Sequence, residues 1–177
     1  DDVLYICYDN EAYMNIGVQR SSATPYAART ATTMAVGAQP GAELGKGKNL
    51  PLIAMAHEIP YVATASVADL HDLEAKVTKA MTIRGARYIH IHVPCPLGWK
   101  SDPAHTIKVA RMAVESGLFP LFEAEGGEVT DRTPIRKKVP VEQYLEIQGR
   151  FKHLFHPRDE RALEAIQAMA DANIDWY

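Results

Sequence analysis

The stretch that decides the fold is VLYICYDNEAYMNIGVQRSSATP, residues 3–25. It begins with a short apolar run, Val3 to Cys7, which is typical of a buried strand. It then becomes polar, with two asparagines, two acids and a Gly-Val-Gln-Arg-Ser-Ser turn. A plain connection needs only a few polar residues. This concentration of side-chain and backbone oxygens therefore indicates a binding site at the carboxyl end of a strand, where parallel sheets bind ligands.

The first strand is expected over residues 3–8, and two further strands over residues 61–66 and 87–93. Between them, apolar residues recur at helical spacing from residue 70 to residue 81, and Gly85 suits the end of that helix. A strand, a helix and a second strand in this order form a parallel unit. We therefore expect an α/β fold with a mainly parallel sheet.

The remaining chain predicts a hairpin and several helices. These are a helix near residues 103–116, a hairpin turning at residues 126–127, and two helices over residues 141–154 and 163–169. Residues 30–51 contain glycines and prolines without a clear period, so we expect a long loop there.

Composition restricts the class of protein. The 177 residues are 47% hydrophobic and 23% charged, which is typical of one soluble globular domain. The net charge of −3 argues against binding to nucleic acid or to a membrane surface, and no apolar run approaches the roughly 18 residues of a spanning helix. Two cysteines make no disulfide framework. The chain opens at Asp1 without an initiator Met or a basic leader, so we expect no export signal and a longer parent protein.

The polar residues after the first strand suit a metal-bound anion. The Asn10 side chain and the Ala12 backbone offer oxygen, which a hard ion such as magnesium requires. Asn15 could present an amide to a ligand while Gly17 lets the backbone approach it closely. Such residues also form ordinary turns, so their spacing leaves both interpretations open.

At this point the sequence resembles a known family. YDNEAYMNIGVQRSSATP is similar to the diphosphate-binding loop in the beta subunit of 2-oxoacid:ferredoxin oxidoreductases, the pyruvate synthase family. HEIPYVATAS, YIHIHVPCPLGW and VEQYLEIQGRFKHL extend the resemblance over nearly the whole chain. It implies a three-layer thiamin diphosphate-binding fold that is incomplete in this chain, because the family's Gly-Asp-Gly and three of its cysteines are expected upstream. Residues 1–125 would be the carboxyl-terminal part of the diphosphate-binding domain, and residues 126–177 a hairpin and helical extension.

The resemblance also implies roles for individual residues. Asn10 would be a side-chain ligand and Ala12 a backbone ligand of Mg²⁺, and Gly17 would belong to the cofactor site. Asn15 would lie beside the thiazolium and the substrate carboxylate, as the catalytic residue of this chain. Cys95, between two prolines, would by itself be taken for a core residue. The resemblance makes it the fourth thiolate ligand of a 4Fe-4S cluster, whose other ligands lie upstream.

The implied function is oxidative decarboxylation of a 2-oxoacid, with pyruvate as first choice, to acyl-CoA and carbon dioxide. Electrons would pass through the iron–sulfur cluster to ferredoxin, and coenzyme A would be the co-substrate. The implied partners are alpha, gamma and ferredoxin-like delta subunits. Iron–sulfur chemistry without an export signal favours an anaerobic cytoplasm.

Three alternatives remain open. Ile16 stands where many members have Thr, which leaves room for an aromatic 2-oxoacid such as phenylglyoxylate. A non-catalytic structural subunit would fit the missing motifs, although Asn10, Asn15 and Cys95 together argue for a cofactor. A thiamin enzyme without iron–sulfur is the third, and Cys95 argues against it.

Other motifs have simpler interpretations. His90 and His92 share one face of a strand and are expected to be packed in the core, since no third metal ligand accompanies them. GAELGKGK, residues 41–48, lacks the spacing of a phosphate loop and is expected to be solvated. RTPIRKKVP, residues 132–140, is expected to be a solvated face, at which an acidic ferredoxin could dock.

Overall fold

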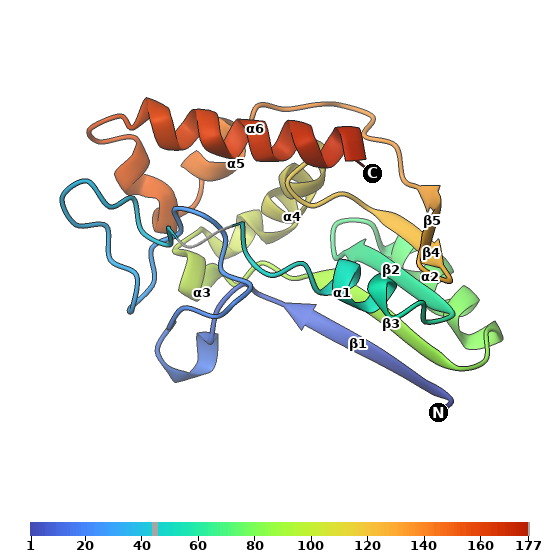
Figure 1. Ribbon diagram of the computed structural model, residues 1–177. Coiled ribbons are helices and arrows are strands. Elements are labelled where there is room, and N and C mark those ends of the chain that lie inside the picture. The colour runs from blue at the N-terminus through green and yellow to red at the C-terminus, as the bar shows by residue number, and fades with distance from the viewer. Residues whose placement is uncertain (44–45, 177) are drawn as a thin grey trace.

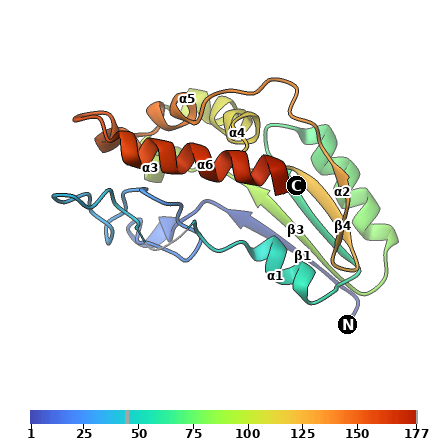
Figure 2. The same cartoon turned by 45° about the horizontal axis from the view of Figure 1, so that its top comes forward.

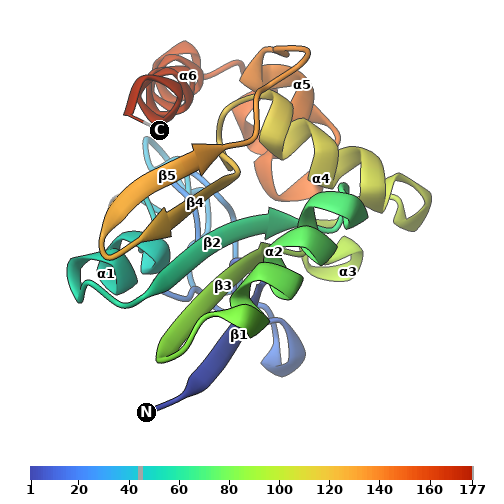
Figure 3. The same cartoon turned by 90° about the vertical axis from the view of Figure 1, so that its right-hand side faces the viewer.

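The computed structural model describes residues 1–43 and 46–176, and its central element is an open sheet of five strands. The strands follow the order β1-β3-β2-β4-β5, which Figure 3 shows from the blue β1 to the orange β5. Their bounds are β1 Val3–Asp9, β2 Tyr61–Ser66, β3 Ala86–His92, β4 Phe122–Glu125 and β5 Glu128–Arg132. β1 and β2 pair with β3 in parallel, whereas β4 and β5 add an antiparallel hairpin beside β2.

Helices cover both faces of this sheet, which gives three layers (Figure 3). The helices are α1 Leu50–Ala56, α2 Leu70–Thr82, α3 Pro96–Trp99, α4 Thr106–Glu115, α5 Val141–Glu146 and α6 Glu160–Trp176, with 3₁₀ turns η1 Met14–Ile16, η2 Pro103–His105 and η3 Gly149–Leu154. Ile89 and Ile91 of β3 pack in one core cluster with Ala80 of α2, while Val62 of β2 packs with Met55 of α1 on the other face. β2 is therefore buried along its whole length.

The helices α4, α5 and α6 pack together near the carboxyl ends of the parallel strands and enclose a further hydrophobic core (Figures 1 and 2). Trp99, Phe151 and Leu163 belong to this largest cluster of buried side chains. Residues from before and after position 125 contribute to it. The predicted boundary between residues 1–125 and residues 126–177 falls in the turn of the β4–β5 hairpin. The division into these two parts stays a prediction.

The expected α/β fold is confirmed, and the three parallel strands lie within one residue of their expected bounds. The expectation that the first strand is buried is wrong, because β1 is the edge strand of the sheet and its Tyr5 and Tyr8 are exposed. The expected helix over residues 141–154 is wrong in its middle. Gln148 adopts an extended conformation, with φ −118° and ψ 116°, and separates α5 from η3. Its buried side chain donates to the Tyr144 carbonyl and accepts from Arg150 Nε, so tertiary hydrogen bonds replace the helix here.

The short helix α1 lies at the end of the segment expected to be a loop. The Asn49 side chain caps it by accepting a hydrogen bond from the Leu52 amide at 3.1 Å, and Pro51 stands in its first turn. Seven apolar residues without a polar face give no helical period, which is why the pattern did not predict it. Within the described residues, none of the helices combines the length and the apolar character needed to cross a bilayer.

The buried Thr64 hydroxyl joins the centre of the sheet to the segment that leads into β4. It donates to the Pro120 carbonyl at 2.8 Å and accepts from the Phe122 amide at 2.9 Å. Thr64→Val keeps the shape and removes both hydrogen bonds of the hydroxyl, so we expect it to lower the free energy of unfolding by about 1–3 kcal/mol. Urea unfolding measures this change. The exposed Thr78→Val on α2 is the matched control, and an equal effect of both variants would contradict the role of the hydroxyl.

Candidate functional site

Two loops meet at the carboxyl ends of β1 and β3. The first is the β1 loop, residues 10–25, and the second is the PCP segment, residues 94–99, which contains α3. The strand register places Asp9 opposite His92, so both loops start at the same edge of the sheet. This is the edge at which parallel sheets bind ligands.

Direct contacts hold the two loops together. The indole Nε1 of Trp99 donates a hydrogen bond to the Asn10 carbonyl at 2.9 Å. The Met14 side chain packs against Gly98, where an added Cβ would approach its sulfur to 2.1 Å. A side chain at position 98 would therefore displace Met14 from its present packing. Cys95 and Met14 both pack against the largest core cluster.

The predicted site residues lie on the β1 loop and on the PCP segment. Asn10 and Ala12 are half-buried, and Asn15 is exposed on the turn η1. Gly17 ends η1 with φ 111°, a conformation that favours glycine. Cys95 is a half-buried free thiol at the N-cap of α3, and its carbonyl accepts from the Trp99 amide at 2.8 Å.

Within the described part of the chain, no cluster of three or more His, Cys, Asp or Glu side chains could hold a metal ion. A metal at the β1 loop would therefore rely on amide and backbone oxygens from this chain and on oxygens from elsewhere. The Asn10 amide and the Ala12 carbonyl are oxygen donors of the kind that Mg²⁺ accepts.

Glu11 was not expected to do more than continue the loop, yet it forms a buried ion pair. Its Oε2 lies 2.6 Å from Nη2 of Arg150, and only 15% of the Glu11 side chain and 4% of the Arg150 side chain are exposed. The guanidinium N–H groups are not aligned with this oxygen, so the contact is electrostatic more than a directed hydrogen bond. Arg150 also stacks on the Trp99 ring, with 3.6 Å from Cζ to the ring centroid. Nothing in the local sequence singles out Arg150, which stands among other polar and charged residues such as Gln148 and Lys152.

The electrostatics of the pair favour the ionised acid. Burial by itself raises the pKa of Glu11, but the positive charge of Arg150 and the neighbouring His92 outweigh it and lower the pKa to about 2. The imidazole Nε2 of His92 lies 3.6 Å from Glu11 Oε1, too far for a hydrogen bond. Burial, and next the nearby Glu11 charge, raise the pKa of Tyr144.

His90 and His92 are buried in β3, as expected for packed residues. His90 is hydrogen-bonded through both ring nitrogens, to the Tyr88 hydroxyl at 2.6 Å and to Asp9 Oδ2 at 3.0 Å. His92 packs between the rings of Phe119 and Trp99. His90 also stacks on Phe119, with 5.9 Å between ring centroids, so both histidines pack against the same aromatic ring.

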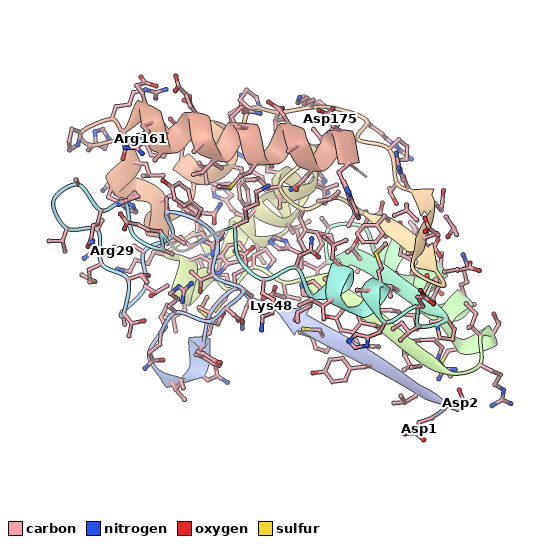
Figure 4. The ribbon with its side chains drawn as sticks, in the orientation of Figure 1. Asp1, Asp2, Arg29, Lys48, Arg161 and Asp175 are labelled. Carbon is pink, nitrogen blue, oxygen red and sulfur yellow. The ribbon has the colours of Figure 1, made fainter. Side chains whose placement is uncertain are left out.

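A cavity of about 180 Å³ lies beside His90 and His92, between the sheet and α6. Asp9, Glu11, His90 and His92 line its sheet side, and Lys48 reaches it from the opposite loop. Figure 4 shows Lys48 near the carboxyl end of β1, while Asp1 and Asp2 mark the far end of that strand. The site and the start of the strand are thus at opposite ends of the sheet.

Two other motifs are placed only in part. Leu44 and Gly45 of GAELGKGK lie outside the described residues, so the expectation of a solvated loop there stays a prediction. In RTPIRKKVP the charged side chains are exposed, which confirms a solvated face, and Lys138 pairs with Asp171 at 2.9 Å. Docking of ferredoxin at this face stays a prediction.

The chain is similar to several known proteins. The model of the family "thiamine pyrophosphate enzyme, C-terminal TPP binding domain" matches residues 1–91. Pyruvate synthase subunit PorB of Methanosarcina barkeri is 49% identical over 99% of this chain and 60% of its own length. PorB of Methanocaldococcus jannaschii is 45% identical, over 96% and 55%. Ketoisovalerate oxidoreductase subunit VorB of Pyrococcus abyssi is 48% identical, over 86% and 50%.

A solved chain of the 2-oxoglutarate:ferredoxin oxidoreductase from Magnetococcus marinus matches with a TM-score of 0.47 and 18% identity, over 76% of this chain and 48% of that chain. The chain spans 50–60% of the length of the three curated relatives above. It belongs to the thiamine pyrophosphate enzymes through their C-terminal TPP binding domain, and over this length it is similar to the PorB and VorB subunits.

The lowered pKa of Glu11 predicts an acid dependence of stability. The pKa of Glu11 is lower in the folded protein, about 2, than in the unfolded chain, 4.5. Ionised Glu11 therefore stabilises the fold at pH values above 4.5, and this stabilisation is lost as the pH falls from about 4.5 toward about 2. The loss amounts to about 3 kcal/mol in the free energy of unfolding. Urea unfolding between pH 5 and pH 3, without added Mg²⁺, should show a shallower decline for Glu11→Gln than for the wild type.

The matched control for this prediction is Glu74→Gln, because Glu74 is exposed on α2. Its pH profile should follow the wild type. A Glu11→Gln profile that also follows the wild type would show that the ion pair does not stabilise the fold.

Proposed function

We propose that this chain is part of a complex that oxidatively decarboxylates a 2-oxoacid, with pyruvate as first choice, to acyl-CoA and carbon dioxide. The observation that carries the proposal is the junction of the β1 loop with the PCP segment through Trp99, Asn10, Met14 and Gly98. It brings the oxygen donors for a metal diphosphate and a free cysteine to one edge of the sheet. Both are needed where a 2-oxoacid is oxidised and its electrons are removed one at a time.

The β1 loop suits magnesium thiamin diphosphate. Thiamin diphosphate, when bound, supplies the nucleophilic carbon that attacks the 2-oxo group and accepts the electron pair left by carbon dioxide. Asn10 and Ala12 would hold the Mg²⁺ of the diphosphate, with further oxygens from outside this chain. The exposed Asn15 would orient the substrate carboxylate by hydrogen bonding, and the backbone at Gly17 would approach the cofactor closely.

Cys95 suits an iron–sulfur ligand. Its thiol is free, and the flanking Pro94 and Pro96 restrict the backbone that directs it. The chain has two cysteines, and the other, Cys7, lies in β1, where burial raises its pKa. One 4Fe-4S cluster needs four thiolates, so the others would come from residues outside this chain.

The proposed partners follow from this chemistry. Coenzyme A would accept the acyl group, and ferredoxin or a similar acceptor would take the electrons. The remaining subunits, of alpha, gamma and ferredoxin-like delta type, would complete the site and contribute the base that activates the cofactor. We place the complex in an anaerobic cytoplasm, because reduced iron–sulfur centres are damaged by oxygen.

The identity of the 2-oxoacid has a second candidate. VorB relatives named ketoisovalerate oxidoreductase match this chain about as closely as the PorB relatives do, at 48% against 45–49% identity. Ile16, beside Asn15, is 70% exposed and so offers an apolar side chain to the substrate side of the loop. A branched acid such as 2-oxoisovalerate is therefore the second choice, and an aromatic acid such as phenylglyoxylate follows.

Anaerobic reduction of a viologen or of ferredoxin by the intact complex tests the proposal, with a panel of 2-oxoacids and with or without coenzyme A and thiamin diphosphate. Reduction that depends on both cofactors is expected, and the preferred acid decides among the candidates. No reduction with any acid, by a complex loaded with iron and thiamin diphosphate, would favour a structural subunit instead.

The role of Cys95 has its own test in the same complex. Cys95→Ser is expected to lower the iron content and to diminish the electron paramagnetic resonance signal of the reduced cluster, because a hydroxyl is a poor replacement for a thiolate. Cys7→Ser is the matched control and should retain both. Full iron content and an unchanged spectrum in Cys95→Ser would exclude Cys95 as a ligand.

A further inference from the structure

Arg150 is the buried cation that the proposed chemistry leaves without a role. It lies in η3, distant in sequence from the β1 loop, and its guanidinium is sandwiched between Glu11 and the Trp99 ring. Its Nε donates a hydrogen bond to Gln148 Oε1 at 2.9 Å, so Gln148 helps to orient the guanidinium group. Its backbone carbonyl accepts a hydrogen bond from the Arg29 amide at 3.0 Å.

The residue that Arg150 holds has an unusual backbone. Glu11 has φ 65°, in the left-handed region that residues other than glycine rarely adopt. Three further bonds hold this segment, each to a different group. The Glu11 amide donates to Asp9 Oδ1 at 2.7 Å, the Glu11 carbonyl accepts from Thr24 Oγ1 at 2.6 Å, and the Asn10 carbonyl accepts from Trp99.

These contacts restrict the backbone between the two proposed magnesium ligands. Glu11 lies between Asn10 and Ala12, and each residue has only two soft backbone dihedrals. With Glu11 held in its left-handed conformation, the peptide planes on its two sides keep one relative orientation, which sets how Asn10 and Ala12 lie relative to each other. Arg150 connects both fixed points, since it contacts the Glu11 carboxylate and the indole that binds Asn10.

We propose that Arg150 is a positioning residue for the metal–diphosphate site: through Glu11 and Trp99 it holds residues 10–12 in the conformation that receives the magnesium diphosphate. The inference rests on the proposed function of the β1 loop. Residues that orient metal ligands in this way change metal affinity or activity by about 10- to 100-fold when they are removed. Arg150 acts without touching the cofactor.

The test is cofactor binding by the assembled complex, stripped of thiamin diphosphate and titrated with it at fixed Mg²⁺ by calorimetry. Arg150→Met should raise the Kd by about 10-fold or more. Arg150→Lys should raise it less, because lysine keeps the charge beside Glu11 and loses the planar stacking on Trp99. The melting temperature of each stripped complex is measured in parallel.

Two matched controls separate positioning from general destabilisation. Arg158→Met removes an exposed arginine that pairs with Glu142 and Glu160, and it should leave the Kd unchanged. Leu163→Ala creates a cavity in the core cluster that also contains Trp99, so it should lower the melting temperature without a matching rise in Kd. If Leu163→Ala weakens binding as much as Arg150→Met at an equal loss of melting temperature, the positioning role is overturned.

The remaining outcomes are also decisive. If Arg150→Met binds thiamin diphosphate with the Kd of the wild type, the positioning role of Arg150 is overturned and the proposed function stands. If the wild-type complex shows no saturable binding of thiamin diphosphate, both the proposed function and the positioning role are overturned. Should Arg150→Met fail to assemble, the neutral pair Glu11→Gln with Arg150→Met avoids an unpaired buried charge. That double variant should bind the cofactor more weakly than the wild type, and equal binding would overturn the proposal.

Discussion

The buried ion pair between Glu11 and Arg150, stacked on Trp99, is the interaction on which the rest of the site depends. Either charge alone would be costly to bury, because a lone ion in the interior loses its hydration without compensation. Together they can be buried only if three distant segments assemble: the β1 loop, the PCP segment and η3. Burial of the ion pair thus requires that these three segments pack together, and this packing in turn determines the conformation of the β1 loop.

The same arrangement explains why the site faces outward. The charged side chain of Glu11 is used inside the protein, so the neighbouring amide and carbonyl oxygens remain for a ligand at the surface. Asn15 and Ile16 are exposed on η1, and Cys95 is half-buried next to the packing of Met14 on Gly98. The inner side of the β1 loop is held by the Glu11–Arg150 ion pair, whereas the exposed Asn15 and Ile16 remain available to the cofactor and the partner subunits that the proposed function requires.

Much of the fold could be predicted from the chain pattern. The parallel strands, α2 and the β4–β5 hairpin depend on local periodicity and on turn glycines, and these are visible in the sequence. The break between α5 and η3 could not be predicted in this way. The stretch is apolar at helical spacing, but the buried Gln148 side chain makes hydrogen bonds across it that outweigh helix propensity. The helix α1 was missed for the opposite reason, since it is short and apolar on all sides.

The sequence by itself determined the class of the domain, the edge of the sheet at which a ligand would bind, and the residue types offered there. These follow from short-range patterns, in which each residue depends mainly on its neighbours. Only the tertiary structure decided that Glu11 turns inward, that Arg150 reaches it from the far end of the chain, and that Trp99 binds the Asn10 carbonyl. Such contacts depend on how separate elements pack around a buried charge, and no local pattern encodes that geometry.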